Sequence, residues 1–275
     1  FKSFRRYVKA VLNKARRDYI SDHLAEQLKT NPKCFWTYIK KVKKEDMGVA
    51  DLKVNNIFIR DPKGKAEALS NQFSSVFTHE DRSAIPEPEG DSIPPLPKLT
   101  IHKEGVFKLL QNLNPNKAQG PDNIPPWILK SCAEEIAPVL QNLFQDSIDQ
   151  GHLPTQWRKA NICAIFKKGD KSQPENYRPV SLTSVVCKML EHIVHSHIMK
   201  HFEANDLLVD SQHGFRAKRS TETQLLQTVH DLTSSFEKNN TTHMAILDFS
   251  KAFDKVPHER LLTKLRHYGI HGNLL

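Results

Sequence analysis

The chain has 275 residues, 38% hydrophobic and 26% charged, which is typical of a soluble globular protein with one large domain or two small ones. Its net charge of +9 favours an anionic partner such as nucleic acid, although a basic protein without such a partner fits equally well. The four cysteines form no C-x-x-C pair, which argues against a zinc module or a disulfide framework. No run approaches about eighteen apolar residues, so we expect no membrane span.

Basic charge is concentrated at the start of the chain. Residues 1–46 hold thirteen Lys/Arg against five Asp/Glu, a net of +8. Apolar spacing over residues 3–30 predicts an amphipathic helix that breaks at Asn31-Pro32, and residues 34–42 predict a second, shorter helix. The basic face suits phosphate contact, and a solvated helix surface is the alternative. We expect a fragment, because the chain starts with Phe1 inside a helical pattern.

The middle of the chain predicts two parts joined by a linker. Residues 52–60 read as a short hairpin and residues 63–78 as an amphipathic helix. Five prolines between residues 86 and 97 make residues 79–98 a loop and the best domain boundary. We therefore divide the chain into a helical N-terminal extension (1–80), a proline-rich linker (81–99) and a main part (100–275).

The main part predicts mostly helices with a few short strands, which is an α+β fold. Thr100 is expected to cap its first helix, and Gly151 to end a helix that spans residues 126–150. The further expected elements are strands at 160–166 and 176–182, a helix to about residue 203, a helix over 221–238 capped by Ser220, a strand at 243–249 buried on both faces, and a helix over 258–268.

The most informative stretch runs from Leu247 to His258. An apolar strand leads directly into Asp248, and an unpaired carboxylate there would be costly unless a cation such as Mg²⁺ stabilised it. A cap of the following turn is the alternative, which spacing alone favours. However, the full string Asp-Phe-Ser-Lys-Ala-Phe-Asp-Lys-Val-Pro-His resembles the first catalytic-aspartate motif of reverse transcriptases from non-LTR, LINE-type and jockey-like retrotransposons.

This resemblance implies an incomplete right-hand polymerase, with fingers and a partial palm. Asp248 would be the first catalytic residue and metal ligand, with the backbone carbonyl of Phe249 as a second ligand for Mg²⁺, or alternatively Mn²⁺. Lys251 and Ala252 would meet the triphosphate, and Phe253 would sit under the sugar and select deoxynucleotides, with core packing as its alternative role. Asp254 is expected to hold the turn rather than bind metal.

A second motif joins the two central strands through a basic turn, Lys167-Lys168-Gly169-Asp170. Lysine supplies a mobile point charge and arginine a fork for phosphate oxygens. The resemblance assigns Lys167 and Arg178 to the triphosphate of the incoming nucleotide. An exposed basic hairpin is the alternative, and the choice between Lys167 and Lys168 stays open.

A third motif, Gln212-His213-Gly214-Phe215-Arg216, resembles the family's element beside the template strand. It implies template contacts from Gln212, Gly214, Phe215 and Arg216, and a loop with incidental charge is the alternative. Gly214 would permit a close backbone approach. The loop Asn116–Pro125 also resembles a family element, for which a structural role is favoured over template contact by Lys117. Four histidines on the helix before residue 203 lack the pattern of a zinc site.

The implied reaction is RNA-templated DNA synthesis, in which a primer 3′-hydroxyl attacks the α-phosphate of a dNTP with two metal ions. Its partners would be template RNA, primer or target DNA and dNTPs, in the nucleus or in a cytoplasmic ribonucleoprotein. The family's second, Asp-Asp motif occurs nowhere in the 275 residues, so we expect the isolated chain to be inactive and poorly soluble. A non-catalytic RNA-binding remnant is the alternative.

Overall fold

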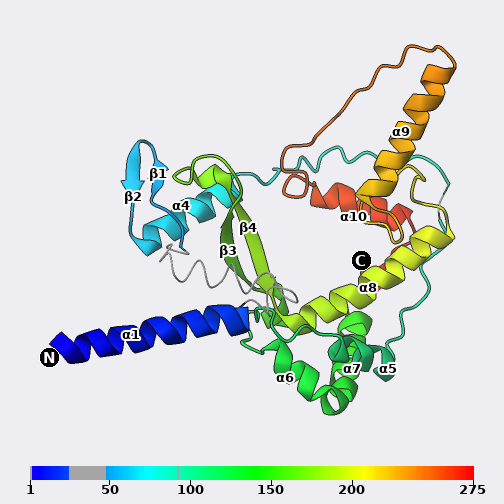
Figure 1. The fold of residues 1–275 in the computed structure, drawn as a ribbon. Coiled ribbons are helices and arrows are strands. Elements are labelled where there is room, and N and C mark those ends of the chain that lie inside the picture. Colours follow the sequence, from blue (N-terminus) through cyan, green and yellow to red (C-terminus); the bar gives the residue numbers. More distant parts are fainter. Residues whose placement is uncertain (1, 25–47, 92) are drawn as a thin grey trace.

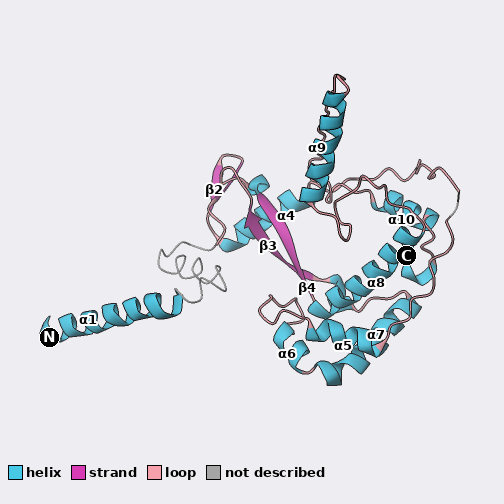
Figure 2. Ribbon diagram, turned by 45° about the vertical axis from the view of Figure 1, so that its right-hand side comes forward, coloured by secondary structure: helices cyan, strands magenta, loops and turns pink. Residues whose placement is uncertain are grey.

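The computed structural model describes residues 2–24, 48–91 and 93–275. Its first element is α1 (Lys2–Asp18), which continues as a π-helical turn (Tyr19–Leu24). This confirms the expected helix as far as residue 24, and the predicted break at Asn31-Pro32 and helix at 34–42 lie outside the described residues. Figure 2 shows α1 apart from the other labelled elements. Its apolar residues Phe4 and Leu12 are exposed.

The expected hairpin is present as β1 (Leu52–Val54) and β2 (Ile57–Ile59), followed by α4 (Pro62–Ser74). The two loop residues, Asn55 and Asn56, have positive φ angles of 51° and 66°, the backbone of a type I′ turn. At the start of α4 the Asp61 carboxylate accepts the Gly64 N–H at 2.7 Å. The helix is shorter than the predicted 63–78, and loop follows it as predicted.

A small buried cluster joins this N-terminal part to the central hairpin. Leu52 and Leu69 pack with Tyr177. The Lys53 N–H also donates to the Ser172 carbonyl at 2.7 Å. The N-terminal extension therefore shares a packed interface with the main part.

The main core lies between α5 (Lys103–Gln111), α6 (Pro126–Ser131), α7 (Ala133–Gln150) and α8 (Val185–Ala204), which gather in the lower part of Figures 1 and 2. Their shared apolar side chains form the largest cluster, which includes Val106, Leu110, Leu129, Ala137, Phe144, Met189 and Leu190. Burial of such side chains is the main stabilising contribution to a fold of this size.

Two predictions in this region are wrong in detail. The single helix expected over 126–150 is two helices, because the backbone leaves the helical region at Cys132 (φ −103°, ψ 29°). Thr100 does not cap α5, whose N-cap is His102. The chain before α5 is extended because Ile101 is buried and donates its N–H to the Gln145 side chain at 2.9 Å. Gly151 does end α7, in the left-handed conformation at φ 62°.

The central sheet is an antiparallel pair, β3 (Ala160–Phe166) and β4 (Tyr177–Thr183), which confirms both predicted strands. Gly120 lies against the end of β4, where an added Cβ would be 2.5 Å from the Ser184 nitrogen. Ser184 is buried and its hydroxyl caps α8. The loop Asn116–Pro125 therefore packs at this junction, in keeping with the structural role that the sequence favours.

After α8 come α9 (Thr221–Glu237), α10 (His258–His267) and a final 3₁₀ turn (Gly272–Leu274). The two α-helices confirm predictions, and Ser220 caps α9 as expected through a reciprocal pair with Thr223. Short 3₁₀ helices at Thr155–Arg158 and Pro174–Asn176 complete the elements. No helix in the described part of the chain is long and apolar enough to cross a membrane.

The predicted buried strand at 243–249 is wrong. This segment has no strand conformation, and Ile246 and Leu247 are each 85% exposed. A strand needs a neighbour to accept and donate its backbone hydrogen bonds, and none of the described strands pairs with this segment. Asp248 therefore stands at the end of an extended, exposed loop. The observed content is mixed helix and strand, with two separate two-stranded sheets.

Candidate functional site

The tip of the β3–β4 hairpin is held by a compact set of hydrogen bonds. The Asp170 carboxylate accepts the Ser172 N–H at 2.9 Å and hydroxyl at 2.8 Å, which lowers the pKa of Asp170. The Asn176 amide donates to the Asp170 carbonyl at 2.9 Å. Gly169 has a φ of 88° and lies close to the Asn176 amide, so a side chain here would be strained. These contacts fix the two strand ends that carry the basic residues.

The register of the hairpin distinguishes the two lysines of the turn. Arg178 is paired with Ile165, and the ladder continues through the Lys167 N–H, which donates to the Asn176 carbonyl at 2.9 Å. Since side chains alternate along a strand, Ile165 and Lys167 share the face of Arg178. Lys168 is one position further on and belongs to the turn. The geometry therefore pairs Lys167, rather than Lys168, with Arg178.

The segment that follows Asp248 is a tight turn leading into α10. Residues 250–255 have turn conformation, and Lys251 has a left-handed backbone with φ 54°. Such a backbone is uncommon for a residue with a side chain and usually marks a constrained turn. The Lys255 N–H donates to the Lys251 carbonyl at 3.1 Å and closes the turn.

The β3–β4 hairpin and the turn after Asp248 line one cavity of about 820 Å³. Its walls contain all seven residues that the sequence assigns to catalysis or nucleotide binding, which are Lys167, Arg178, Asp248, Phe249, Lys251, Ala252 and Phe253. Two carboxylates besides Asp248 also line it, Glu175 and Asp254. A volume in this range suits a small organic ligand. Segments about seventy residues apart in sequence thus meet around one space.

The charges in this cavity suit a triphosphate with a cation. Lys167, Arg178 and Lys251 supply positive charge for phosphate oxygens. Asp248 supplies hard oxygen ligands, and Mg²⁺ characteristically binds one or two carboxylates together with substrate phosphates. Among the described residues no group of three His, Cys, Asp or Glu side chains is placed to hold a metal by itself. The Asp248 carboxylate beside three basic side chains fits a cation that binds together with a phosphate ligand.

The predicted template loop reaches the edge of the same cavity through one aromatic contact. The rings of Phe215 and Phe253 meet edge to face, with centroids 5.7 Å apart and planes at 82°. Phe215 has a left-handed backbone at φ 61° and is exposed. Gln212 donates its side-chain amide to the Gly214 carbonyl at 3.1 Å and so shapes the loop.

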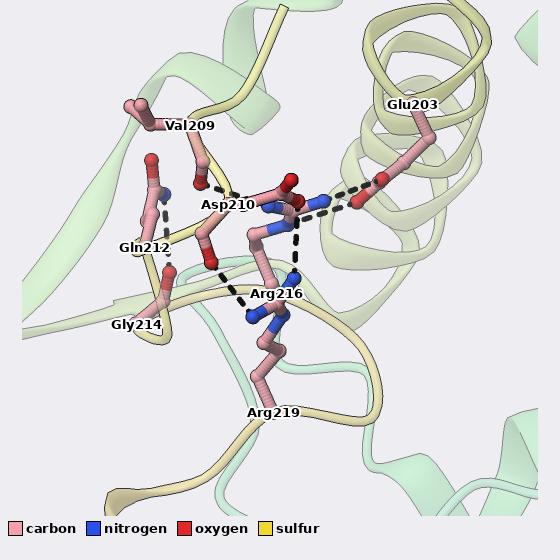
Figure 3. A network of polar contacts seen from close by, with 7 residues as sticks. All are labelled: Glu203, Val209, Asp210, Gln212, Gly214, Arg216 and Arg219. Atoms are coloured by element: carbon pink, nitrogen blue, oxygen red, sulfur yellow. Dashed lines mark hydrogen bonds and ion pairs between the residues drawn. The ribbon is translucent and has the colours of Figure 1, made fainter. Parts of the chain in front are cut away.

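Arg216, predicted to contact template phosphate, is engaged inside the protein (Figure 3). Its guanidinium donates to both Glu203 oxygens, at 3.2 and 2.7 Å, and to the Val209 carbonyl at 3.0 Å. The side chain is only 9% exposed, and the pair lowers the pKa of Glu203 and raises that of Arg216. Nearby, Arg219 binds the carbonyl and carboxylate of Asp210. Both arginines brace the loop.

The structure also shows the surroundings of Gly214 and of two histidines on α8. Among the described residues no protein atom lies within 4 Å of a Cβ built on Gly214, so packing within the protein does not require glycine there, and the close approach of a template strand stays a prediction. Two of the histidines before residue 203 bind backbone carbonyls. His197 Nε2 lies 2.6 Å from the Pro97 oxygen, and His201 Nε2 lies 2.8 Å from the Tyr268 oxygen. These two histidines join α8 to the linker and to the end of α10.

Sequence reasoning missed one wall of the cavity. Gln72, Phe73 and Val76 line it from α4 and the residues just after it. The helical pattern of residues 63–78 indicated that Phe73 lies on an apolar face, but no pattern in a single sequence shows which partner covers such a face. The N-terminal extension was therefore not connected to the site.

Comparison with known proteins identifies this arrangement. Residues 165–274 match the family model described as reverse transcriptase (RNA-dependent DNA polymerase). The chain is 27% identical to the RNA-directed DNA polymerase from mobile element jockey of Drosophila funebris, over 93% of this chain and 29% of the relative. It is 26% identical to the probable RNA-directed DNA polymerase from transposon BS of Drosophila melanogaster, over 75% of this chain and 24% of the relative.

A third relative is the Pol polyprotein from the type-1 retrotransposable element R2 of Popillia japonica, 31% identical over 47% of this chain and 18% of the relative. The chain thus spans about a quarter of the length of the first curated relatives it matches. The matched residues contain the β3–β4 hairpin, the Arg216 loop and the Asp248 turn. This part of the chain is therefore a reverse-transcriptase domain, similar to the RNA-directed DNA polymerases of jockey and other non-LTR elements.

Proposed function

We propose that this chain carries the nucleotide-binding part of an RNA-directed DNA polymerase that copies retrotransposon RNA into DNA. The observation that supports the proposal is the shared cavity. The basic hairpin tip and the Asp248 turn, predicted separately from sequence motifs, face one space of about 820 Å³. In polymerase terms, the β3–β4 hairpin belongs to the fingers and the Asp248 turn to the palm.

In this proposal each residue acts on one part of an incoming dNTP. Arg178 and Lys167 bind the triphosphate, the arginine through its two-pronged fork and the lysine as a point charge. The backbone N–H groups of Lys251 and Ala252 donate to phosphate oxygens. Phe253 lies under the sugar, where its ring leaves no room for a 2′-hydroxyl. Phe215 supports that ring from the template side through their edge-to-face contact.

Asp248 and the Phe249 carbonyl would hold Mg²⁺, or Mn²⁺ in its place, together with the phosphates of the nucleotide. Such a cation, when bound, activates the primer hydroxyl and neutralises charge on the departing pyrophosphate. The protein residues hold the α-phosphate near Asp248 through their grip on the β- and γ-phosphates, which orients it for a primer 3′-hydroxyl.

Template contact comes from the exposed rim of the loop that Arg216 and Arg219 brace. Gln212, Gly214 and Phe215 are exposed there, as is Lys218. We propose template RNA and primer or target DNA as partners, in the nucleus or in a cytoplasmic ribonucleoprotein. The 275 residues contain no Asp-Asp dipeptide, so we propose that the chain alone binds nucleotide without extending a primer.

Nucleotide binding by the purified chain tests this function. A fluorescent dATP analogue should bind in the presence of Mg²⁺ and be released by EDTA. Asp248→Asn should remove the effect of Mg²⁺ while leaving residual binding through the basic residues, and Lys168→Ala, which alters a neighbouring exposed lysine outside the cavity, should bind like wild type. Mg²⁺-independent binding that Asp248→Asn leaves unchanged would contradict the proposal, as would primer extension by the chain alone.

A further inference from the structure

The turn after Asp248 and the start of α10 are held by two residues that follow α4 at the end of the N-terminal extension. The Thr78 hydroxyl donates to the Lys255 carbonyl at 2.9 Å, across 177 positions of sequence. Two residues later, the Glu80 carboxylate accepts the N–H groups of Glu259 and Arg260, at 2.9 and 3.1 Å. Figure 1 shows the linker after α4 running past the loop that leads into α10.

Glu80 acts as the missing cap of α10. The N-cap residue of this helix, Pro257, has no side chain that can accept a hydrogen bond. The first N–H groups of a helix need acceptors, and a carboxylate there also interacts favourably with the helix dipole. The Glu80 side chain is 9% exposed and lies 3.7 Å from the Arg260 guanidinium, so the carboxylate is enclosed by its partners.

The turn has few other restraints. Within it, the Val256 N–H donates to the Phe253 carbonyl at 3.4 Å, a long bond, in addition to the bond between Lys255 and Lys251. Among the residues that the structure describes, Thr78 is the only one outside residues 248–256 that forms a hydrogen bond with them. The ring of Phe215 is an apolar contact. Thr78 therefore supplies the directional restraint on this turn from outside it, and Glu80 holds the start of α10, which follows the turn directly.

The same stretch of chain also forms a cavity wall. Gln72, Phe73 and Val76 line the same cavity as the Asp248 turn, and Thr78 and Glu80 follow within four residues of Val76. The residues that line the cavity and the residues that hold the turn and α10 thus belong to one continuous segment, residues 72–80. A shift of this segment would move both sides of the cavity together.

We propose that Glu80 and Thr78 are positioning residues, which fix the Asp248 turn against the β3–β4 hairpin and so set the nucleotide cavity. This inference rests on the proposed nucleotide function and extends the site into the N-terminal part of the chain. Neither residue touches the nucleotide in this proposal. Their effect is on the distance and orientation of Asp248 and Phe253 relative to Lys167 and Arg178.

The test combines hydrogen exchange with nucleotide binding in the full 275-residue chain. The variants are Glu80→Ala, Glu80→Gln and Thr78→Val. The control is Glu89→Ala, an exposed linker glutamate that forms no hydrogen bond or ion pair with the described residues. In Glu80→Ala we expect the Glu259 and Arg260 amides to exchange about tenfold faster and the Kd for Mg·dATP to rise about tenfold. Thr78→Val should loosen residues 251–256, and Glu80→Gln, which retains one acceptor, should be intermediate.

The two readouts separate a positioning role from a purely structural one. Faster exchange with unchanged nucleotide affinity would overturn the proposal, because Glu80 would then only cap α10. Unchanged exchange at residues 255–260 would overturn it as well. Exchange that rises throughout the β3–β4 hairpin would indicate general unfolding and count against it. If the wild-type chain binds no nucleotide, the proposed function fails, and exchange in Glu80→Gln still decides whether this segment holds the turn.

Discussion

Phe215 and Phe253 pack edge to face at 5.7 Å although they come from different motifs, one assigned to the template and one to the nucleotide sugar. Both side chains are otherwise exposed, so the contact is a local bridge at the rim of the cavity. It joins the loop that the sequence assigns to the template to the rim of the cavity that it assigns to the nucleotide. The contact therefore connects the two predicted activities of the chain.

Replacing Phe253 tests its role at the sugar. Phe253→Val removes the ring while keeping an apolar side chain, and we expect the preference for dATP over ATP to fall by about tenfold or more. Binding measured with both nucleotides checks this, and Phe236→Leu serves as a control that alters an exposed aromatic residue of α9 outside the cavity. An unchanged preference in Phe253→Val would assign the ring to packing alone.

Arg178 and Lys168 provide a matched pair for the triphosphate. Arg178→Lys keeps the charge but loses the planar fork, so we expect the Kd for dATP to rise about tenfold. The same change should hardly affect binding of deoxyadenosine, which has no phosphate. Lys168→Ala should leave both affinities unchanged, since Lys168 lies outside the cavity. Equal losses in the two variants would indicate nonspecific charge attraction.

The Arg216–Glu203 pair predicts a pH dependence of stability. The hydrogen bonds from Arg216 lower the pKa of Glu203 from its ordinary value of 4.5. A depressed pKa in the folded state stabilises the protein above 4.5, and this contribution is lost as the pH falls through the folded-state value. Glu203→Gln should therefore lower the urea midpoint at pH 7, and its difference from wild type should shrink below pH 4.5. A difference that is constant with pH would contradict the assignment.

Gly120 and Gly105 predict opposite effects of the same substitution. A Cβ at Gly120 would lie 2.5 Å from the Ser184 nitrogen and 2.6 Å from the Thr183 carbonyl group, all backbone, so Gly120→Ala should destabilise by about 1–3 kcal/mol. Gly105 lies in α5 with nothing within 4 Å, so Gly105→Ala should stabilise by roughly 0.5–1 kcal/mol. Chemical denaturation of both variants checks the pair, and equal effects would contradict the packing at Gly120.

Local patterns were sufficient for much of the fold. Alternation and turn residues located β3 and β4, and Ser220 located the start of α9, because these signals lie within a few residues of one another. The strand expected at 243–249 failed because pairing depends on a distant neighbour, which periodicity does not show. The break between α6 and α7 at Cys132 was not predicted, since no Gly or Pro marks it in the sequence.

In the candidate site, too, local motifs were predicted from the sequence and contacts between distant residues were not. The motifs predicted seven residues for catalysis or nucleotide binding, and the structure brings all seven of them to one cavity. The internal partners of Arg216 were not predicted, because an arginine bound to Glu203 looks the same in sequence as an arginine that is free for phosphate. Glu80 gave no signal, because its partners on α10 lie 179 and 180 residues away.

Photocrosslinking of an azido-dATP to the full chain tests the shared nucleotide cavity most directly. In the presence of Mg²⁺, we predict that labelled peptides map to residues 167–179 and 248–254, and that excess dATP competes with the labelling. Asp248→Asn should reduce labelling of both peptides together. Labelling of only one of these segments, or labelling of both that neither dATP nor Asp248→Asn reduces, would contradict a single nucleotide site between the hairpin and the Asp248 turn.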